Sequence, residues 1–261
     1  MTHAHLTLSA IVITRNEAHN LHDCLQSMHG LVNEIIVVDS QSTDATVAIA
    51  QQHGAKVTQP ADWPGFGPQK NRALDLATCD WVLSIDADER VTSELAVEIR
   101  NFLQSPQAHQ VVACTLPRLS SYCGRPMKHS GWWPDPVARL FRRQSCRFSD
   151  DRVHERLLTT GPLHPMTQLL LHESFHSLEQ VLDKVNHYST EGALKLWEKG
   201  RKATLGTAIA HGAWAFFRTY FLQKGFLDGR EGFLVSVSNA EGTYYRYLKL
   251  MFLNERSPHS K

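Results

Sequence analysis

Several features that would identify other classes of protein are missing from this chain of 261 residues. It has only five cysteines, an odd number without close pairs, which predicts reduced thiols and no cysteine-based metal site. It has no uncharged apolar run of about 18 residues or more, so we expect no membrane-spanning helix. The N-terminus lacks a basic segment followed by a long apolar one, so we expect no signal peptide. The reduced thiols predict a cytoplasmic protein.

The chain also lacks the excess positive charge typical of nucleic-acid-binding proteins and the glycines of a dinucleotide-binding turn. The formal net charge is only +1, which gives no electrostatic reason to expect a nucleic-acid partner. The first apolar run, residues 8–14, is followed by Arg15, Asn16 and Glu17, without a glycine. The glycines of a dinucleotide-binding turn let the backbone approach a pyrophosphate, so their absence argues against a dinucleotide-dependent oxidoreductase.

The N-terminal part of the chain alternates between short apolar runs and segments with helical periodicity. Strands are predicted at 8–14, 35–38, 56–57 and 81–85, and helices at 20–28, 45–53, 69–77 and 92–103. Repeated strand–helix units predict an α/β fold with a mostly parallel, Rossmann-like sheet. With 42% hydrophobic residues, the chain can bury a substantial core.

Acidic residues follow three of the predicted strands. Glu17 lies beyond the first strand, Asp39 closes the second, and Asp86 and Asp88 follow the fourth. In such sheets ligands bind beyond the carboxyl ends of the strands, so we expect these groups at one site. Two aspartates spaced i, i+2 on an extended segment should point the same way and share a divalent cation, Mg²⁺ or Mn²⁺. A solvated acidic loop is the alternative interpretation.

The chemistry of these strand ends suits a nucleotide. Carboxylates such as Glu17 and Asp39 can accept hydrogen bonds from a base N–H and from ribose hydroxyls. Lys70, on the helix before the fourth strand, could meet a phosphate or a base carbonyl. The alternatives are a helix cap for Asp39, a surface position for Glu17 and a solvated helix face for Lys70.

Four motifs in this order support a more specific interpretation. They are I-V-I-T-R-N-E at 11–17, V-V-D-S-Q-S-T-D-A-T at 37–46, Q-K-N-R-A-L-D at 69–75 and L-S-I-D-A-D-E at 83–89. Together they resemble the nucleotide-sugar half of family-2 glycosyltransferases with the GT-A fold. The resemblance implies an inverting transferase that uses a metal-bound nucleotide-diphosphate sugar. It assigns the metal to Asp88, and the nucleotide sugar to Thr14, Arg15, Glu17, Asp39, Lys70, Asp86 and Ala87.

The second half of the predicted domain carries candidate acceptor-binding residues. Strands are predicted at 111–119 and 137–142, and a loop with Trp132 and Trp133 lies between them. Flat aromatic rings stack on sugars, so the two tryptophans could bind a carbohydrate or could simply hold the loop on the domain. Arg139 and Arg142 suit a phosphorylated or carboxylated acceptor, although they could equally hold the donor diphosphate or be solvated.

An inverting transfer needs a carboxylate that takes the proton of the acceptor hydroxyl, and residues 149–156, S-D-D-R-V-H-E-R, offer candidates. Glu155 ranks first and Asp151 second, because V-H-E resembles the acceptor-side motif of glycosyltransferases that act on the inner core of lipopolysaccharide. Those relatives also carry segments similar to G-W-W-P-D at 131–135 and R-L-F-R-R at 139–143. This resemblance implies transfer of glucose from UDP-glucose to a heptose of the lipopolysaccharide core.

His172 is a further candidate metal ligand. It follows an apolar run at 169–171, and a late histidine completes the metal site in GT-A enzymes, which the resemblance transfers to this position. Since the chain has fifteen histidines, a surface or core role for His172 is the alternative.

From residue 177 onward the sequence predicts helices. We expect a catalytic domain at 1–176, with a nucleotide-sugar half at 1–100 and an acceptor half at 101–176, followed by a helical extension at 177–261. Helices around 205–222 and 231–256 combine aromatic residues with Lys and Arg, as in helices that lie at a membrane surface. A peripheral protein on the inner face of the bacterial inner membrane is therefore expected. The alternatives are packing on the protein's own domain or on a second copy in a homo-oligomer.

Two other functional classes stay open from the sequence. A phosphatase of the haloacid-dehalogenase type also begins with a strand and D-x-D, but Arg90 stands where it needs Thr or Val. A non-catalytic nucleotide-sugar-binding scaffold would share the nucleotide site and lack turnover.

Overall fold

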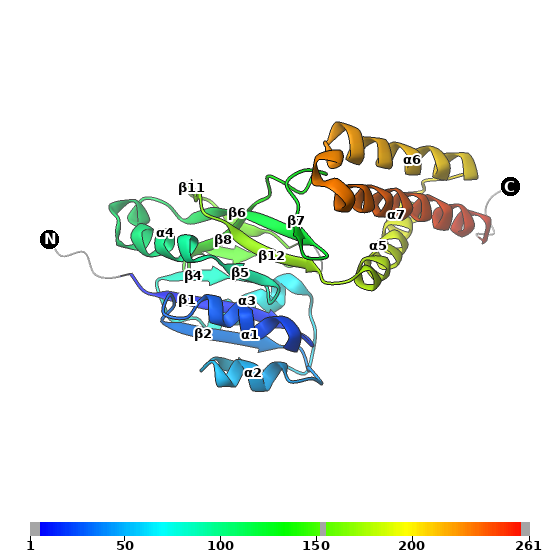
Figure 1. Ribbon diagram of the computed structural model, residues 1–261. Helices are drawn as coiled ribbons and strands as arrows, with labels where there is room; N and C mark the ends of the chain where they lie inside the picture. The colour runs from blue at the N-terminus through cyan, green and yellow to red at the C-terminus, as the bar shows by residue number, and fades with distance from the viewer. Residues whose placement is uncertain (1–5, 152–154, 257–261) are drawn as a thin grey trace. The chain divides into compact units, whose positions relative to one another are not determined.

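The computed structural model describes residues 6–151 and 155–256 (Figure 1). The chain divides into two compact units, the first within Met1–Arg118 and Asp135–His172 and the second within Leu119–Pro134 and Glu173–Lys261. The second unit thus includes residues 119–134, which the sequence analysis grouped with the acceptor half.

The first unit contains the predicted parallel strands. They are β1 (Leu8–Thr14), β2 (Glu34–Asp39), β3 (Lys56–Thr58) and β4 (Trp81–Ser84). Their order is β3-β2-β1-β4, and every neighbouring pair is parallel. The carboxyl ends of β1, β2 and β4 therefore lie at one edge of the sheet, which confirms the predicted α/β arrangement.

Helices cover both faces of this sheet. They are α1 (Ala18–Ser27), α2 (Thr46–Gln52), α3 (Phe66–Leu76) and α4 (Ser93–Gln104). One core packs Leu21 of α1 and Leu95 of α4 against β1 and β4, and the other packs Leu74 of α3 against the opposite side. Thr92 caps α4 by accepting a hydrogen bond from the Leu95 N–H, as its sequence predicts.

Beyond β4 the sheet continues with antiparallel strands. These are β5 (Glu89–Val91), β6 (Ala113–Tyr122), β8 (Pro136–Arg142) and β12 (Leu170–Phe175), in the order β4-β8-β6-β12-β5. β8 pairs antiparallel with both β4 and β6, and β12 pairs antiparallel with β5. The short elements nearby are η1 (Pro106–His109), β9 (Cys146–Phe148), β10 (Leu157–Thr159) and β11 (Leu163–Pro165).

The second unit is mainly helical, which confirms the predicted C-terminal helices. Its elements are β7 (Arg125–Pro126), α5 (Leu178–Glu198), α6 (Leu205–Phe217), the π-helical turn η2 (Arg218–Leu222), η3 (Gly225–Asp228) and α7 (Gly229–Arg256). α7 packs against both α5 and α6. Among the described residues, none of these helices combines the length and apolar character that crossing a membrane requires.

Candidate active site

Asp39 is the centre of a hydrogen-bonded cluster at the carboxyl ends of β1 and β2. Its side chain is fully buried, and Oδ1 accepts hydrogen bonds from the hydroxyls of Thr14 (2.8 Å) and Ser42 (2.5 Å). Oδ2 accepts from the Ser42 backbone N–H (2.9 Å) and from the Gln59 side-chain amide (3.0 Å). Neutral donors therefore satisfy this buried carboxylate, and of these partners Gln59 is the exposed one.

The turn after β1 brings further predicted residues to the same edge. Asn16 adopts a left-handed backbone (φ 55°), and its side-chain oxygen accepts a hydrogen bond from the Thr43 N–H (2.8 Å). Glu17 accepts one from Asn20 on α1 (3.1 Å), and burial raises the pKa of Glu17. Arg15 is exposed and forms no ion pair with the described residues.

Asp86 and Asp88 lie in a turn instead of on an extended segment. β4 ends at Ser84, and the Glu89 N–H donates to the Asp86 carbonyl oxygen (2.9 Å) to close the turn that leads into β5. The extended segment assumed for these two residues is therefore wrong, and the i, i+2 rule, which holds only within a strand, does not give the direction of their carboxylates. Each aspartate has its own partners, and Ala87 between them is buried.

Lys70 joins Asp86 to Glu155. Its Nζ lies 3.0 Å from Asp86 Oδ1 and 2.7 Å from Glu155 Oε1, and the lysine is only 3% exposed. Arg139 binds the other oxygen of Asp86. Burial alone would raise the pKa of Asp86, but the charges of Arg139 and Lys70 outweigh it and hold this pKa well below its usual range. Asp86 consequently stays ionised.

Glu89 is a site residue that the sequence analysis missed. It is fully buried, and its Oε1 accepts hydrogen bonds from Arg139 (2.7 Å) and Arg118 (3.2 Å) while Oε2 accepts one from the Asp86 N–H (2.9 Å). Arg118 also pairs with Asp135 at 2.8 Å. The available signal was an acidic residue directly after D-x-D in an apolar context. The approach of Arg118 on β6 and Arg139 on β8 to this turn has no sequence signature.

The first turns of α3 position the segment that leads to Glu155. The side chain of Asn71 exchanges two hydrogen bonds of 2.9 Å with the backbone of Phe148, as a neighbouring strand would. Gly67 lies so close to this segment that a Cβ there would be 1.8 Å from the Ser149 carbonyl oxygen. The same helix carries Lys70, so α3 sets the distance between the lysine and Glu155.

Asp151, the second candidate base, is exposed and accepts a hydrogen bond from the Ser149 hydroxyl (2.8 Å). The intervening residues of the V-H-E motif, together with residue 152, lie outside the described residues.

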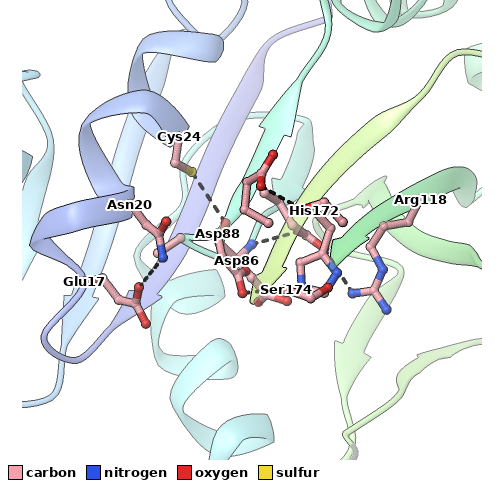
Figure 2. A network of polar contacts seen from close by, with 12 residues as sticks. Glu17, Asn20, Cys24, Asp86, Asp88, Arg118, His172 and Ser174 are labelled. Carbon is pink, nitrogen blue, oxygen red and sulfur yellow. Dashed lines mark hydrogen bonds and ion pairs between the residues drawn. The ribbon is translucent and has the colours of Figure 1, made fainter. Parts of the chain in front are cut away.

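Asp88 lies next to His172. The Asp88 Oδ2 and the His172 Nε2 are 3.3 Å apart, and both side chains are partly exposed (Figure 2). Pairing of β12 with β5 places His172 opposite Glu89, which explains how a histidine so distant in sequence reaches the turn. A cluster of three or more acidic, histidine or cysteine ligands is not found within 6–151 and 155–256. The protein thus offers one carboxylate and one imidazole, a donor set that suits Mg²⁺ or Mn²⁺ when a ligand and water complete the coordination.

The charges around this turn favour a cation. The carboxylates are Asp86, Asp88, Glu89, Asp135 and Glu155, and the permanent cations paired with them are Lys70, Arg118 and Arg139. Arg90 adds a fourth cation at the turn, where it donates to the Ala87 carbonyl oxygen, so carboxylates exceed cations by one and the site would still oppose an incoming diphosphate. A divalent cation that arrives with the diphosphate would remove this repulsion.

The two arginines predicted to bind the acceptor are not brought together. Arg139 is buried, and its guanidinium is committed to Asp86 and Glu89. Arg142 lies opposite Trp81, at the other end of β4, where it donates to the backbone carbonyls of residues 108 and 111. The structure therefore does not bring Arg142 to the acidic edge.

Trp132 and Trp133 belong to the second unit. Trp132 packs against Tyr122 and Phe175, with ring centroids 6.0 and 6.1 Å apart, and Trp133 is half-buried.

Comparison with known proteins identifies the family. The family model described as "Glycosyl transferase family 2" matches residues 9–161, which include the strand ends, the aspartate turn and Glu155.

Similar curated proteins match almost the whole chain. An uncharacterized glycosyltransferase of Rickettsia felis is 32% identical over 97% of this chain and 92% of its own length. A protein of Rhizobium meliloti described as "Lipopolysaccharide core biosynthesis glycosyltransferase LpsC" is 29% identical over 96% of this chain and 93% of its own length.

Solved structures share the fold. Residues 1–349 of TarS from S. aureus, crystallised in complex with UDP-GlcNAc, superpose with a TM-score of 0.51 at 15% identity over 97% of this chain and 93% of that one. Mannosyl-3-phosphoglycerate synthase from Rubrobacter xylanophilus gives 0.50 at 20% identity over 76% of each chain. At these identities the likeness establishes the GT-A fold and no more. With the family model and the relatives, it follows that this chain belongs to glycosyl transferase family 2 and is a glycosyltransferase.

Proposed function

We propose that this enzyme transfers a hexose, with inversion, from a nucleotide-diphosphate sugar to a heptose of the lipopolysaccharide core, and that UDP-glucose is the donor. The rhizobial relative with a lipopolysaccharide-core name supports this acceptor class. The acidic strand ends support a nucleotide donor, because they present carboxylates where the ligands of such sheets bind.

The observation that carries the proposal is the bridge of Lys70 between Asp86 and Glu155. It holds a candidate base beside the donor edge and fixes its orientation. In the proposed step the acceptor oxygen bonds to the anomeric carbon while the bond from this carbon to the diphosphate oxygen breaks. Glu155 receives the hydroxyl proton, and the bonding electron pair leaves with the nucleoside diphosphate.

Asp88 and His172 are the residues that would hold a divalent cation, Mg²⁺ or Mn²⁺. When bound, the cation neutralises charge on the leaving diphosphate. Asp86 stays ionised because of Lys70 and Arg139, so it can accept hydrogen bonds from sugar or ribose hydroxyls.

At the nucleoside end, a base N–H would replace the exposed Gln59 amide on Asp39, which preserves the hydrogen bonding of this buried carboxylate. Thr14, Arg15, Glu17 and the backbone of Ala87 complete the proposed donor site.

The direct test compares Glu155→Gln with Asp151→Asn. We expect Glu155→Gln to lower the transfer rate by about 10²- to 10⁴-fold with little change in donor affinity, because only proton removal is lost. Asp151→Asn, an equally conservative change at an exposed position a few residues away, should keep the wild-type rate. Transfer at the wild-type rate by Glu155→Gln would reject Glu155 as the base. Donor binding by calorimetry without hydrolysis or transfer would instead favour a nucleotide-sugar-binding scaffold.

We also propose that the helical unit attaches to the inner face of the bacterial inner membrane. α6 and η2 expose large apolar side chains, among them Trp214 (55%), Phe221 (50%) and Leu222 (57%). Exposed cations on the same unit, such as Lys199 and Arg201, suit anionic headgroups. Co-sedimentation with anionic vesicles should be lost in Trp214→Ser/Phe221→Ser. Vesicle-independent dimerisation that disappears in this variant would instead assign the apolar face to a homo-oligomer.

A further inference from the structure

The second unit contains a cavity of about 380 Å³ that the proposed chemistry at the aspartate turn does not use. Its walls come from α5, α6, η2, α7 and the loop that carries Trp132. Polar side chains from different elements converge on it, notably Arg218, Gln223, Asn239 and Arg246. All of these residues lie within the second unit, so the cavity belongs to that unit alone.

The two arginines give the cavity an uncompensated positive charge. Among the described residues, neither Arg218 nor Arg246 forms an ion pair with a carboxylate. The Nε of Arg246 is buried against Gly192 of α5, which holds this side chain in place. An oxyanion in the cavity would supply the missing counter-charge and match the planar donor geometry of the guanidinium groups.

The rest of the lining suits a saccharide. Gln223 and Asn239 present side-chain amides, which can bond to hydroxyl groups as donors and acceptors. Trp132 forms part of one wall, and its ring is held by Tyr122 and Phe175. An immobilised aromatic ring beside amides and cations is a suitable surface for a sugar ring that carries a negative group.

The loop that carries Trp132 is fixed before any ligand binds. Asp228 is buried and accepts hydrogen bonds from the His129 N–H (2.9 Å) and the Ser130 hydroxyl (3.2 Å). The Ser130 N–H in turn donates to the Gln223 carbonyl oxygen (2.9 Å). Such pre-organisation lowers the entropy that ligand binding would otherwise cost.

We propose that this cavity binds a saccharide that bears an oxyanion, either a phosphate or a carboxylate. The inference rests on the proposed function in one respect: the saccharide with its phosphate or carboxylate would be part of the acceptor. The shared chemistry is a charged oxyanion on a sugar ring, and the two sources are separated by the choice of probes.

The test is calorimetry on the full-length protein with four probes: glucose 6-phosphate, glucuronate, glucose and inorganic phosphate. We expect glucose 6-phosphate, glucuronate or both to bind at least about tenfold more tightly than glucose, because the charged hydrogen bonds to arginine are lost with the neutral sugar. Whichever anionic sugar binds more tightly identifies the oxyanion. Equal binding of glucose, equal binding of inorganic phosphate alone, or no binding of either anionic sugar would overturn the proposal.

Substitutions then locate the binding. Arg218→Gln and Arg246→Gln should each weaken binding of the anionic sugar about tenfold or more, whereas Arg230→Gln removes an exposed, ion-paired cation of the same unit and should leave it unchanged. Gly242→Leu provides a second route that keeps every charge. A Cβ at Gly242 would meet only Val185, at 3.8 Å, so a side chain can begin there without a clash, and leucine would take up space in the cavity. Wild-type binding by both Arg246→Gln and Gly242→Leu would place the ligand elsewhere and refute the site.

Donor hydrolysis separates this inference from the proposed function. The cavity variants should keep the wild-type rate of donor hydrolysis in the absence of acceptor, because they leave the aspartate turn untouched. If the anionic sugars fail to bind while donor hydrolysis and transfer proceed, the cavity proposal fails alone. If they bind at the cavity but no sugar nucleotide is consumed, the proposed transfer fails and the cavity stands as a binding site.

Discussion

Asp39 ends β2 and Asp86 follows β4, the two strands that flank β1, yet the protein holds the two carboxylates in opposite ways. Neutral groups donate to Asp39: two hydroxyls, one backbone N–H and one amide. Two permanent cations, Lys70 and Arg139, surround Asp86.

These different partners suggest different tasks: Asp39 is suited to recognise the donor by hydrogen bonding, and Asp86 is held as a charged group. Neutral donors fix the position of Asp39 and leave an exchangeable partner, Gln59, that a ligand N–H can replace. Cations fix the ionisation of Asp86, and through Lys70 they connect it to Glu155. We therefore expect changes at Asp39 to affect mainly donor affinity and stability, and changes around Asp86 to affect mainly the chemical step.

Removal of the shared cation should have the largest effect. Lys70→Met leaves Asp86 and Glu155 without the lysine at an almost fully buried position, so we expect a stability loss of about 3 kcal/mol and a fall in kcat of about 10²-fold or more. Thermal denaturation and steady-state transfer assays measure the two effects. The matched control is Arg72→Met on the same helix, which breaks a more exposed ion pair with Asp62 and should cost less than about 1 kcal/mol. Equal losses of stability and of kcat in the two variants would show that the ion pairs of Lys70 with Asp86 and Glu155 have no special role.

The sequence was most informative for the parallel part of the sheet. Apolar runs and the polar residues after them identified β1, β2 and β4 and placed Asp39 and Asp86 at one edge, because parallel topology makes strand ends meet. The resemblance to family 2 added Glu155, which the structure places on Lys70.

It was least informative where tertiary pairing decides the environment of a side chain. Arg139 and Arg142 look equivalent in sequence, but antiparallel pairing of β8 with β4 takes them to opposite ends of that strand. The turn after β4 likewise gives Asp86 and Asp88 different partners, and the buried role of Glu89 depends on arginines from β6 and β8. These contacts depend on non-local pairing, which has no local periodicity to reveal it.

Gly67→Ala should disturb the spacing between Lys70 and Glu155 without changing any charge. In Gly67→Ala the new methyl group would clash with the Ser149 carbonyl oxygen, so α3 and the segment before Glu155 must move apart. We expect a stability loss of about 2–3 kcal/mol and a lower kcat with little change in donor affinity. Gly206→Ala in α6 is the control, because a Cβ there meets only the Thr204 hydroxyl at 3.7 Å. Wild-type kcat in Gly67→Ala would show that the spacing of Lys70 and Glu155 is not critical.

Asp39→Asn tests the role of the carboxylate that has only neutral hydrogen-bond donors as partners. Asparagine turns one acceptor oxygen into a donor. At the Oδ2 position this donor would face the Ser42 N–H and the Gln59 amide, and at the Oδ1 position the Thr14 and Ser42 hydroxyls would have to reverse and accept. We expect a stability loss of about 2 kcal/mol, weaker donor binding and a kcat that changes less than in Lys70→Met. Gln59→Ala, which keeps three of the four hydrogen bonds, should cost less than about 1 kcal/mol. The two-part interpretation of the site fails if Asp39→Asn lowers kcat as strongly as Lys70→Met does.

Glu34, at the other end of β2, has both neutral donors, as Asp39 has, and a cation, as Asp86 has. It therefore tests how much such a mixed set of partners contributes to stability. It accepts hydrogen bonds from the hydroxyls of Ser9 and Thr78 and pairs with Lys56 at 2.7 Å. Burial alone would raise the pKa of Glu34, but the hydrogen bonds from Lys56, Ser9 and Thr78 outweigh it and lower the pKa to about 2.

Because the pKa of Glu34 is lower in the folded than in the unfolded protein, its contribution to stability is complete above the unfolded value of about 4.3 and is lost as the pH falls towards 2. The shift corresponds to at most about 3 kcal/mol, and glutamine keeps part of the hydrogen bonding, so Glu34→Gln should lose about 1–2 kcal/mol at pH 7. Urea denaturation of both proteins between pH 7 and 3 measures this difference, which should shrink steadily below pH 4.5. A difference that stays constant over this range would mean that packing, and not the ionised carboxylate, accounts for the effect of Glu34.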